Sequence, residues 1–103
     1  MNFDQKCYQL LKKIPAGQVT TYREIAHKLG TRAYRAVGNA MNRNPDAPEV
    51  PCHRVICSDG KIGGYAGGTK KKINLLRQEG IEISQDKVVN VKRYLYRFAH
   101  HNR

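Results

Sequence analysis

The chain has 103 residues and carries 19 Lys and Arg against eight Asp and Glu, which gives a net charge of +11. We expect residues 1–103 to form a single domain that ends in a basic tail, about residues 92–103. No apolar run approaches the roughly 20 residues that cross a bilayer, and the first residues lack a signal-peptide core. We therefore expect a protein without membrane contact, in the cytoplasm or, in a eukaryote, in the nucleus. We also expect it to be a monomer.

The excess of positive charge predicts a polyanionic partner, and nucleic acid is the commonest one. An acidic membrane surface is the alternative, but no strongly amphipathic basic helix offers large apolar residues for insertion. The three cysteines are an odd number, which argues against a disulfide framework. Neither a Cys-x-x-Cys pattern nor a Cys/His cluster is present, so we expect no structural metal and no cofactor.

Apolar residues at helical spacing predict a first helix over residues 3–13, with Cys7 on its buried face. Thr21 and Glu24 form a capping-box pattern at the start of a second helix, residues 21–30, which Gly30 ends. The two helices are separated by a Pro-Ala-Gly segment that stops the first one.

Thr31 is the expected cap of a third helix, residues 32–42. A polar stripe without acidic residues runs along one side of it: Arg32, Arg35, Asn39 and Asn42, with Arg43 beside them. Such a helix, following another after a tight glycine turn, is typical of a helix-turn-helix that binds DNA. The alternative is an ordinary solvated face.

Loops are expected over much of residues 44–68, around a short apolar segment at residues 50–57. A glycine-rich loop at residues 63–68 contains one aromatic residue and allows close approach of a ligand, but lacks the pattern of a phosphate-binding loop. Further along we expect a helix from Thr69 to near Glu79 with Ile73, Leu75 and Leu76 buried, a hairpin of residues 81–83 and 87–91, and a short helix in the tail. The fold class is therefore mainly α with small β elements, a winged-helix-like helix-turn-helix domain.

Cys52 lies between Pro51 and His53, and Arg54 follows. A His and an Arg alongside a thiol both favour the thiolate, which is the nucleophilic form. Because successive side chains of an extended strand point to opposite faces, the segment must turn sharply for His53 to serve Cys52. A buried structural thiol is the alternative interpretation.

Glu79 falls at the C-terminal end of the fourth helix, where the macrodipole disfavours a carboxylate. A residue placed against local preference can serve a function, whereas neutralisation by Arg77 or by the many lysines is the alternative. Tyr22 and Tyr65 are candidates for lining a base pocket, in which a phenol can donate to a ring nitrogen. Otherwise they are half-buried packing residues.

Residues 50–56, Val-Pro-Cys-His-Arg-Val-Ile, resemble the active-site signature of the O6-alkylguanine-DNA alkyltransferases. Residues 15–22 are similar to the segment that leads into that family's helix-turn-helix, and residues 35–41 with Asn44-Pro45 resemble its recognition helix and hinge. Residues 64–68 resemble its substrate loop and residues 76–80 its closing helix. The motifs occur in the family's order over roughly residues 3–83, and together they are highly specific.

The resemblance implies DNA repair by the family's catalytic domain. An O6-alkylguanine is flipped out of double-stranded DNA, and its alkyl group moves irreversibly to Cys52, once per molecule. It further implies that His53 passes the thiol proton, through a water, to Glu79, and that Asn44 holds the turn between the recognition helix and the site. Arg35 would fill the gap that the flipped nucleotide leaves, and its neighbours on the stripe would contact DNA.

The resemblance also implies how the guanine is held. Tyr22 would donate to a ring nitrogen, and Tyr65 would pack on the base or its alkyl group. The carbonyls of Cys52 and Val55 would accept from the exocyclic amine, while the Ala66 amide would reach O6. Ala66 stands where the family often has Ser, so a hydroxyl contact is lost there.

Many family members carry a further N-terminal domain, and this sequence starts at the first helix of the expected active domain, so we expect any metal site of that domain to be missing. The competing interpretation is an alkyltransferase-like protein that flips and holds the lesion without transfer. Those relatives lack the acceptor cysteine, which Cys52 argues against. A small DNA-binding regulator would need neither Cys52 nor Glu79, and a thiol hydrolase would need an oxyanion site that the sequence does not show.

Overall fold

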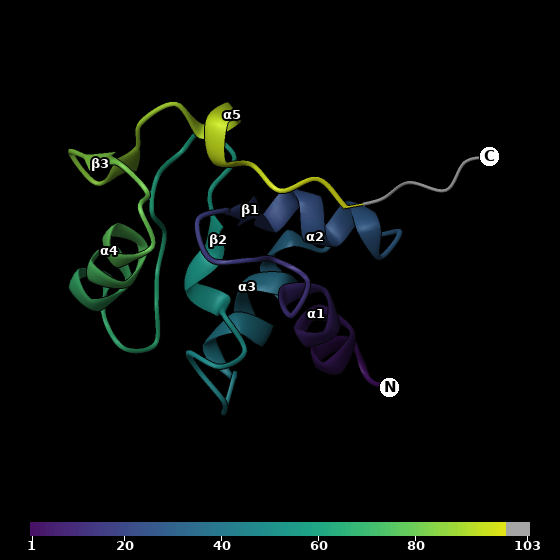
Figure 1. Cartoon of the computed structure of the whole chain (residues 1–103). Coiled ribbons are helices and arrows are strands. Elements are labelled where there is room, and N and C mark those ends of the chain that lie inside the picture. The colour runs from purple at the N-terminus through teal and green to yellow at the C-terminus, as the bar shows by residue number, and fades with distance from the viewer. Residues whose placement is uncertain (99–103) are drawn as a thin grey trace.

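The computed structural model describes residues 1–98 and shows a mainly helical chain with two small sheets (Figure 1). In chain order the elements are α1 (Phe3–Leu11), β1 (Thr20–Thr21), α2 (Tyr22–Lys28), α3 (Tyr34–Asn42), the 3₁₀ turn η1 (Cys52–Arg54), β2 (Val55–Ile56), α4 (Thr69–Gln78), β3 (Ile83–Ser84), β4 (Lys87–Val88) and α5 (Val91–Tyr94). The predicted fold class is confirmed. No helix among residues 1–98 is long and apolar enough to cross a membrane. The end of the predicted basic tail, residues 99–103, lies outside the described residues.

Helix α1 begins at a polar cap and ends before the predicted residue 13. The Asn2 side chain accepts a hydrogen bond from the Gln5 amide at 2.8 Å, and the Gln5 side chain accepts one from the Asn2 amide at 3.0 Å. Cys7 is fully buried, as predicted. Because the helix contacts both α3 and η1, it supports the two elements that carry the candidate site.

Helix α2 has the predicted start and stop. The Thr21 hydroxyl accepts from the Glu24 amide at 3.0 Å, which is the Thr half of the predicted capping box. Gly30 has φ +76°, and the Thr31 amide donates across it to the Ala26 carbonyl at 3.0 Å. This is the glycine-ended turn that reverses the chain between two helices.

The predicted start of α3 was wrong, because Thr31 caps a turn and not the helix. Its hydroxyl accepts from the Ala33 amide at 3.1 Å, and the Tyr34 amide donates to the Arg32 carbonyl at 2.8 Å. These short-range bonds hold residues 31–33 in a turn, so α3 begins at Tyr34. Arg32 therefore precedes the helix on which the sequence placed it.

The first sheet joins three distant segments of the chain. Strand β1 pairs in parallel with β2, with Thr20 opposite Val55. Just before β1, the Val19 amide donates to the Tyr94 carbonyl at 2.9 Å and the Tyr96 amide donates to the Val19 carbonyl at 2.7 Å. The C-terminal segment therefore runs beside β1, as the yellow trace in Figure 1 shows.

The second sheet is the predicted hairpin, with shorter strands than expected. Strands β3 and β4 are antiparallel, and Ser84 lies opposite Lys87. The two residues between them, Gln85 and Asp86, have φ of +53° and +62°. Two consecutive positive φ values are the mark of a tight type I′ hairpin turn.

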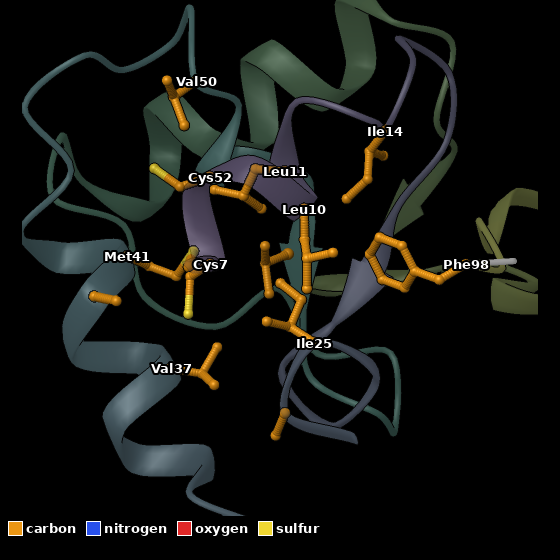
Figure 2. Close-up of a cluster of buried hydrophobic side chains, with 13 residues drawn as sticks. Cys7, Leu10, Leu11, Ile14, Ile25, Val37, Met41, Val50, Cys52 and Phe98 are labelled. Carbon is orange, nitrogen blue, oxygen red and sulfur yellow. The ribbon is translucent and has the colours of Figure 1, made fainter. Parts of the chain in front are cut away.

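Two apolar clusters form the core. The main one consists of Cys7, Leu10, Leu11, Ile14, Ile25, Ala26, Val37, Ala40, Met41, Val50, Cys52, Val55 and Phe98, and Figure 2 shows Cys52 at one edge of it. The second consists of Val19, Ile56, Ile62, Leu76, Ile81, Ile83, Val88 and Tyr94. Of the predicted buried face of α4, only Leu76 is fully buried. Ile73 and Leu75 are half-buried, and Lys72 takes the inner position.

The C-terminal segment completes the main core. Phe98 is buried in that cluster, and the Tyr96 ring packs edge-on against it at a centroid distance of 5.2 Å. Tyr94 is buried in the second cluster. The segment therefore joins both clusters as well as the sheet.

Replacing Phe98 with Ala should lower the free energy of unfolding by about 3–5 kcal/mol, because it leaves a cavity in the main core. Urea unfolding measures the change. Met1→Ala also removes a large apolar side chain, but Met1 is 77% exposed, so this control should change stability by less than about 0.5 kcal/mol. A Phe98→Ala protein as stable as the control would show that the segment contributes nothing to the core.

Candidate functional site

Cys52 begins a 3₁₀ turn that also contains His53. The turn is the sharp bend that the sequence required, because an extended segment would direct these neighbouring side chains to opposite faces. Cys52 is 3% exposed and His53 is 1% exposed. The turn therefore holds both side chains almost completely inside the protein.

A single carboxylate holds the residues that follow Cys52. Glu79 Oε2 lies 2.9 Å from His53 Nε2, and both Glu79 oxygens accept hydrogen bonds from Arg54, at 2.9 and 2.7 Å. Arg54 also donates to the Ile14 carbonyl at 2.7 Å. Glu79 thus joins η1 to the C-terminal end of α4, and the helix-end position that seemed unfavourable is stabilised by two partners.

These contacts correct three sequence expectations. His53 and Glu79 touch directly, so the expected water between them was wrong. Arg54 pairs with Glu79 and donates to the Ile14 carbonyl. Its charge therefore stabilises the carboxylate, whereas the sequence predicted that it would favour the Cys52 thiolate. Arg77, the expected alternative neutraliser of Glu79, donates to the Ile83 carbonyl at 3.0 Å.

The protonation states of the pair follow from burial and hydrogen bonding. Burial lowers the pKa of His53 and outweighs the hydrogen bond that its ring donates to Glu79, which raises that pKa. Burial raises the pKa of Glu79, but the hydrogen bonds with Arg54 and His53 together outweigh it and leave that pKa lowered. An ionised Glu79 only accepts hydrogen bonds, so His53 Nε2 carries a proton, and in the neutral ring Nδ1 is an acceptor. Among residues 1–98, the buried Nδ1 has no partner.

Asn44 connects the end of α3 to the segment that leads into η1. Its side-chain nitrogen donates to the Val50 carbonyl at 2.7 Å, and its side-chain oxygen accepts from the Asp46 amide at 3.0 Å. One side chain therefore spans the loop at residues 44–50. The family resemblance implied a role for Asn44 in holding this turn.

Tyr22 opens α2 and reaches the loop after β2. A Cβ atom on Gly63 would lie 3.1 Å from the Tyr22 hydroxyl and 3.4 Å from the Cys57 sulfur, and φ at this residue is +77°, so the position favours glycine. Burial, and then the nearby Cys57 and Cys52, raise the pKa of Tyr22 to about 12. The Tyr22 phenol therefore keeps its proton at neutral pH and is a hydrogen-bond donor.

The glycine-rich loop presents Tyr65 to the core and Ala66 to solvent. Tyr65 is half-buried and packs against the main cluster that contains Cys52, while Ala66 is exposed. Burial, followed by nearby Cys52, raises the pKa of Tyr65. The structure thus brings Tyr65, Tyr22 and Cys52 to one region of the domain.

Lys72 is a charged residue of this region that sequence reasoning missed. It is fully buried, and its Nζ donates to the Val55 carbonyl at 2.6 Å and to the Gly64 carbonyl at 3.1 Å. The same nitrogen lies 5.9 Å from the centre of the Tyr22 ring. Lys72 therefore ties β2 to the glycine-rich loop. Its position one helical turn before buried Leu76 was the signal in the sequence.

Both carbonyls expected to hold a guanine amine already have partners. The Val55 carbonyl accepts from Lys72, and the Cys52 carbonyl accepts from the Val55 amide. A carbonyl oxygen has two lone pairs, so each can accept a second hydrogen bond. Neither carbonyl is excluded from the expected contact, but each must share its oxygen.

The predicted polar stripe is exposed along and beside α3. Arg35, Asn39 and Asn42 are exposed on the helix, and Arg32 is exposed just before it. Arg43 differs, because its guanidinium forms two hydrogen bonds with Asp4, at 2.7 and 2.8 Å. Arg43 is therefore paired with Asp4 of α1, which the sequence pattern did not indicate.

Fold and site together define a helix-turn-helix domain that holds a buried cysteine against a His–Glu–Arg arrangement. The family model described as the DNA binding domain of 6-O-methylguanine DNA methyltransferase matches residues 2–81. The chain belongs to this family.

Several known proteins are similar to the chain. A methylated-DNA–protein-cysteine methyltransferase of Methanosarcina barkeri is 53% identical over 79 residues, which are 76% of this chain and 50% of that protein. A bifunctional methyltransferase/endonuclease of Picrophilus torridus is 47% identical over 90 residues, which are 86% of this chain and 30% of that protein. This chain thus spans half or less of the length of these curated relatives.

A solved structure resembles the chain over almost the whole of both molecules. It is S. pombe Atl1 in complex with damaged DNA containing O6-carboxymethylguanine. The TM-score is 0.82 at 36% identity, and the match covers 92% of this chain and 94% of that one.

The buried Lys72 should give the protein a distinct stability profile at alkaline pH. Burial lowers the pKa of Lys72 to about 8, whereas an unfolded lysine titrates near about 10.4. Between these values the folded chain loses this proton while the unfolded chain keeps it, so the contribution of Lys72 to stability rises with pH. The rise is about 1.4 kcal/mol for each unit of pKa difference. Below pH 8 Lys72 is protonated in both the folded and the unfolded chain, so the folded state bears the full cost of burying its ammonium group.

Urea unfolding at pH 7.5 and at pH 10 measures this effect in the parent protein, in Lys72→Met and in Lys71→Met. The free energy of unfolding of the parent, taken relative to that of Lys72→Met, should be higher at pH 10 than at pH 7.5. The exposed neighbour Lys71 is the matched control, and its variant should follow the parent. A parent–Lys72→Met difference that does not change with pH would contradict the assignment.

Proposed function

We propose that the chain repairs alkylated DNA by transferring an alkyl group from O6 of guanine to Cys52, after flipping the base, once per molecule. The observation that carries the proposal is the 3₁₀ turn that holds buried Cys52 next to His53, whose ring is bonded to Glu79. Curated relatives that are about 50% identical are named methylated-DNA–protein-cysteine methyltransferases, which supports the proposal. In this proposal the chain corresponds to the catalytic domain of its longer relatives.

In the proposed reaction, His53 Nδ1 takes up the thiol proton while ionised Glu79 stabilises the resulting imidazolium. The Cys52 sulfur then attacks the alkyl carbon. A sulfur–carbon bond forms, the carbon–O6 bond breaks, and its electron pair remains on the guanine. Tyr22 donates a proton to a ring nitrogen and is reprotonated from the His53 imidazolium through solvent. The thiol proton therefore ends on the guanine, and the net products are a thioether and a neutral guanine. Nothing regenerates the thiol, which makes the transfer stoichiometric.

The proposed substrate contacts use groups around Cys52. Tyr65 packs on the base or its alkyl group, and the Ala66 amide donates to O6. The carbonyls of Cys52 and Val55 accept from the exocyclic amine in addition to their present partners. Asn44 keeps the turn into η1 in place. None of these contacts requires a metal or a cofactor.

The proposed DNA-binding surface is the exposed face of α3. Arg35 enters the duplex in place of the flipped nucleotide and offsets part of the lost stacking. Arg32, Asn39 and Asn42 contact the DNA around it, and Arg43 contributes while paired with Asp4. We propose that residues 1–103 act as one monomeric domain where chromosomal DNA is found, in the cytoplasm or, in a eukaryote, the nucleus.

The second candidate function is lesion binding without transfer. It is favoured by the match to Atl1, which covers nearly all of both chains, and that structure contains damaged DNA. Against it stands Cys52, since alkyltransferase-like proteins without transfer lack the acceptor cysteine. The two candidates share base flipping and differ only in the fate of the alkyl group.

Mixing the protein with duplex DNA that carries O6-methylguanine should add one methyl group to each chain, and peptide mapping should place it on Cys52. Intact mass spectrometry detects the addition. The Cys52→Ala variant should bind the same duplex without any change in mass. Cys57→Ala is the control for a second thiol in the same region and should still be methylated on Cys52.

Repaired guanine in the presence of Cys52→Ala would overturn the proposal. Tight binding of the lesion by the parent protein without a mass change would favour the second candidate function.

Replacing Arg35 with Ala should slow transfer from duplex DNA by about tenfold if Arg35 contributes about 1.4 kcal/mol to the flipped state. Reaction with a free O6-alkylated guanine base needs no flipping and should keep its rate. Single-turnover kinetics with both substrates measure the difference. Lys13→Ala, which removes an exposed cation after α1, should leave both rates unchanged. Equal slowing with duplex and free base would refute the role of Arg35 in flipping.

A further inference from the structure

A groove with a volume of about 300 Å³ lies between the start of α2 and the C-terminal segment. Its polar lining residues are Thr21, Arg23, Glu24, Ser58, Lys92 and Arg97, and its apolar ones are Val91 and Leu95. Three cations face one carboxylate in this lining. The groove is thus positively charged on balance and contains hydroxyl donors, which is the chemistry that binds a phosphodiester.

The cations of the groove have no acidic partner among the described residues. Within residues 1–98, none of Arg23, Lys92 and Arg97 forms a salt bridge. All three are exposed, while Glu24 is half-buried. A phosphate that enters the groove would therefore meet three solvated cations without displacing an ion pair.

The C-terminal wall of the groove is held in place by the core behind it. Tyr94 and Phe98 are buried, and the backbone at residues 94–96 is bonded to Val19 on both sides. Because side chains alternate along an extended segment, Leu95 and Arg97 face the groove while Tyr94 and Phe98 face the core. Arg97 is thereby presented on a backbone that is already ordered.

The groove adjoins the candidate site at two points. Thr21 and Arg23 flank Tyr22, and Ser58 follows Cys57, whose sulfur and the Tyr22 hydroxyl both lie next to Gly63. A DNA strand that delivers a base to Cys52 would pass close to this groove. Lys92 and Arg97 lie beyond residue 81, where the match to the family model ends.

We propose that this groove binds a backbone phosphate of the DNA next to the lesion, and that the C-terminal segment extends the DNA-binding surface of the family's domain through Lys92 and Arg97. The proposal rests on the DNA binding of the proposed function. Thr21 contributes from the end of β1, Arg23 contributes from α2, and Ser58 contributes a hydroxyl from the loop after β2. The segment therefore serves both the core and the contact with DNA.

The test compares the salt dependence of DNA binding by the parent protein and by the double variant Lys92→Gln/Arg97→Gln. Binding to an undamaged duplex is measured at several salt concentrations, because each lost phosphate contact reduces the slope of log K against log salt by about 0.9. The double variant should lose up to about 1.8 from the slope. The unfolding midpoint should match the parent, since both side chains are exposed.

The matched control is Lys12→Gln/Lys13→Gln, which removes the same charge at exposed residues after α1 that do not line the groove. Its slope should stay at the parent value. An unchanged slope in the groove variant, or an equal loss in the control, would overturn the proposal. Methylation of Cys52 is scored separately. A protein that loses slope in the groove variant yet never alkylates Cys52 would sink the transferase function and leave the phosphate site standing.

Discussion

The Glu79 carboxylate is the contact on which the arrangement of this domain depends. It accepts two hydrogen bonds from Arg54 and lies 2.9 Å from His53, while Arg54 continues to the carbonyl of Ile14. The end of α4, the turn η1 and the segment after α1 therefore meet at one charged group. Removing one member of a partly buried charge network leaves the others without partners, which costs more than the network gains when it forms. The position of the Cys52 turn is consequently determined by a helix that lies far along the chain.

Much of the site could be predicted because its signals are local. A cysteine followed by a histidine indicates a reactive thiol wherever the backbone bends, and the 3₁₀ turn supplies that bend. Glu79 stood out because a carboxylate at a helix C-terminus needs a partner. Helix ends at Thr21 and Gly30 follow from capping rules that involve residues three or four positions apart. In each case the signal lay within one turn of the chain, although the partners of Glu79, His53 and Arg54, come from the distant turn η1.

The features that escaped prediction arise from contacts between distant segments. Lys72 looks like one of three surface lysines, and only the carbonyls of Val55 and Gly64 explain its burial. Arg43 looks like part of the basic stripe, but Asp4 on α1 accepts from it. The start of α3 failed for a different reason, since the Thr31 hydroxyl satisfied a turn amide in preference to a helix amide. Local preference alone does not decide between two such partners.

A chain of this length must place structural and functional residues on the same elements. Along α3, Val37, Ala40 and Met41 face the core while Arg35 and Asn39 face solvent, so the helix both packs into the core and presents polar side chains. Side chains alternate in the same way along the C-terminal segment, where Phe98 faces the core and Arg97 faces the groove. Because each side chain of the proposed DNA-binding surface has a buried neighbour on its own element, the groups that we propose to face DNA are ordered before any partner arrives. That order reduces the entropy that binding must otherwise remove.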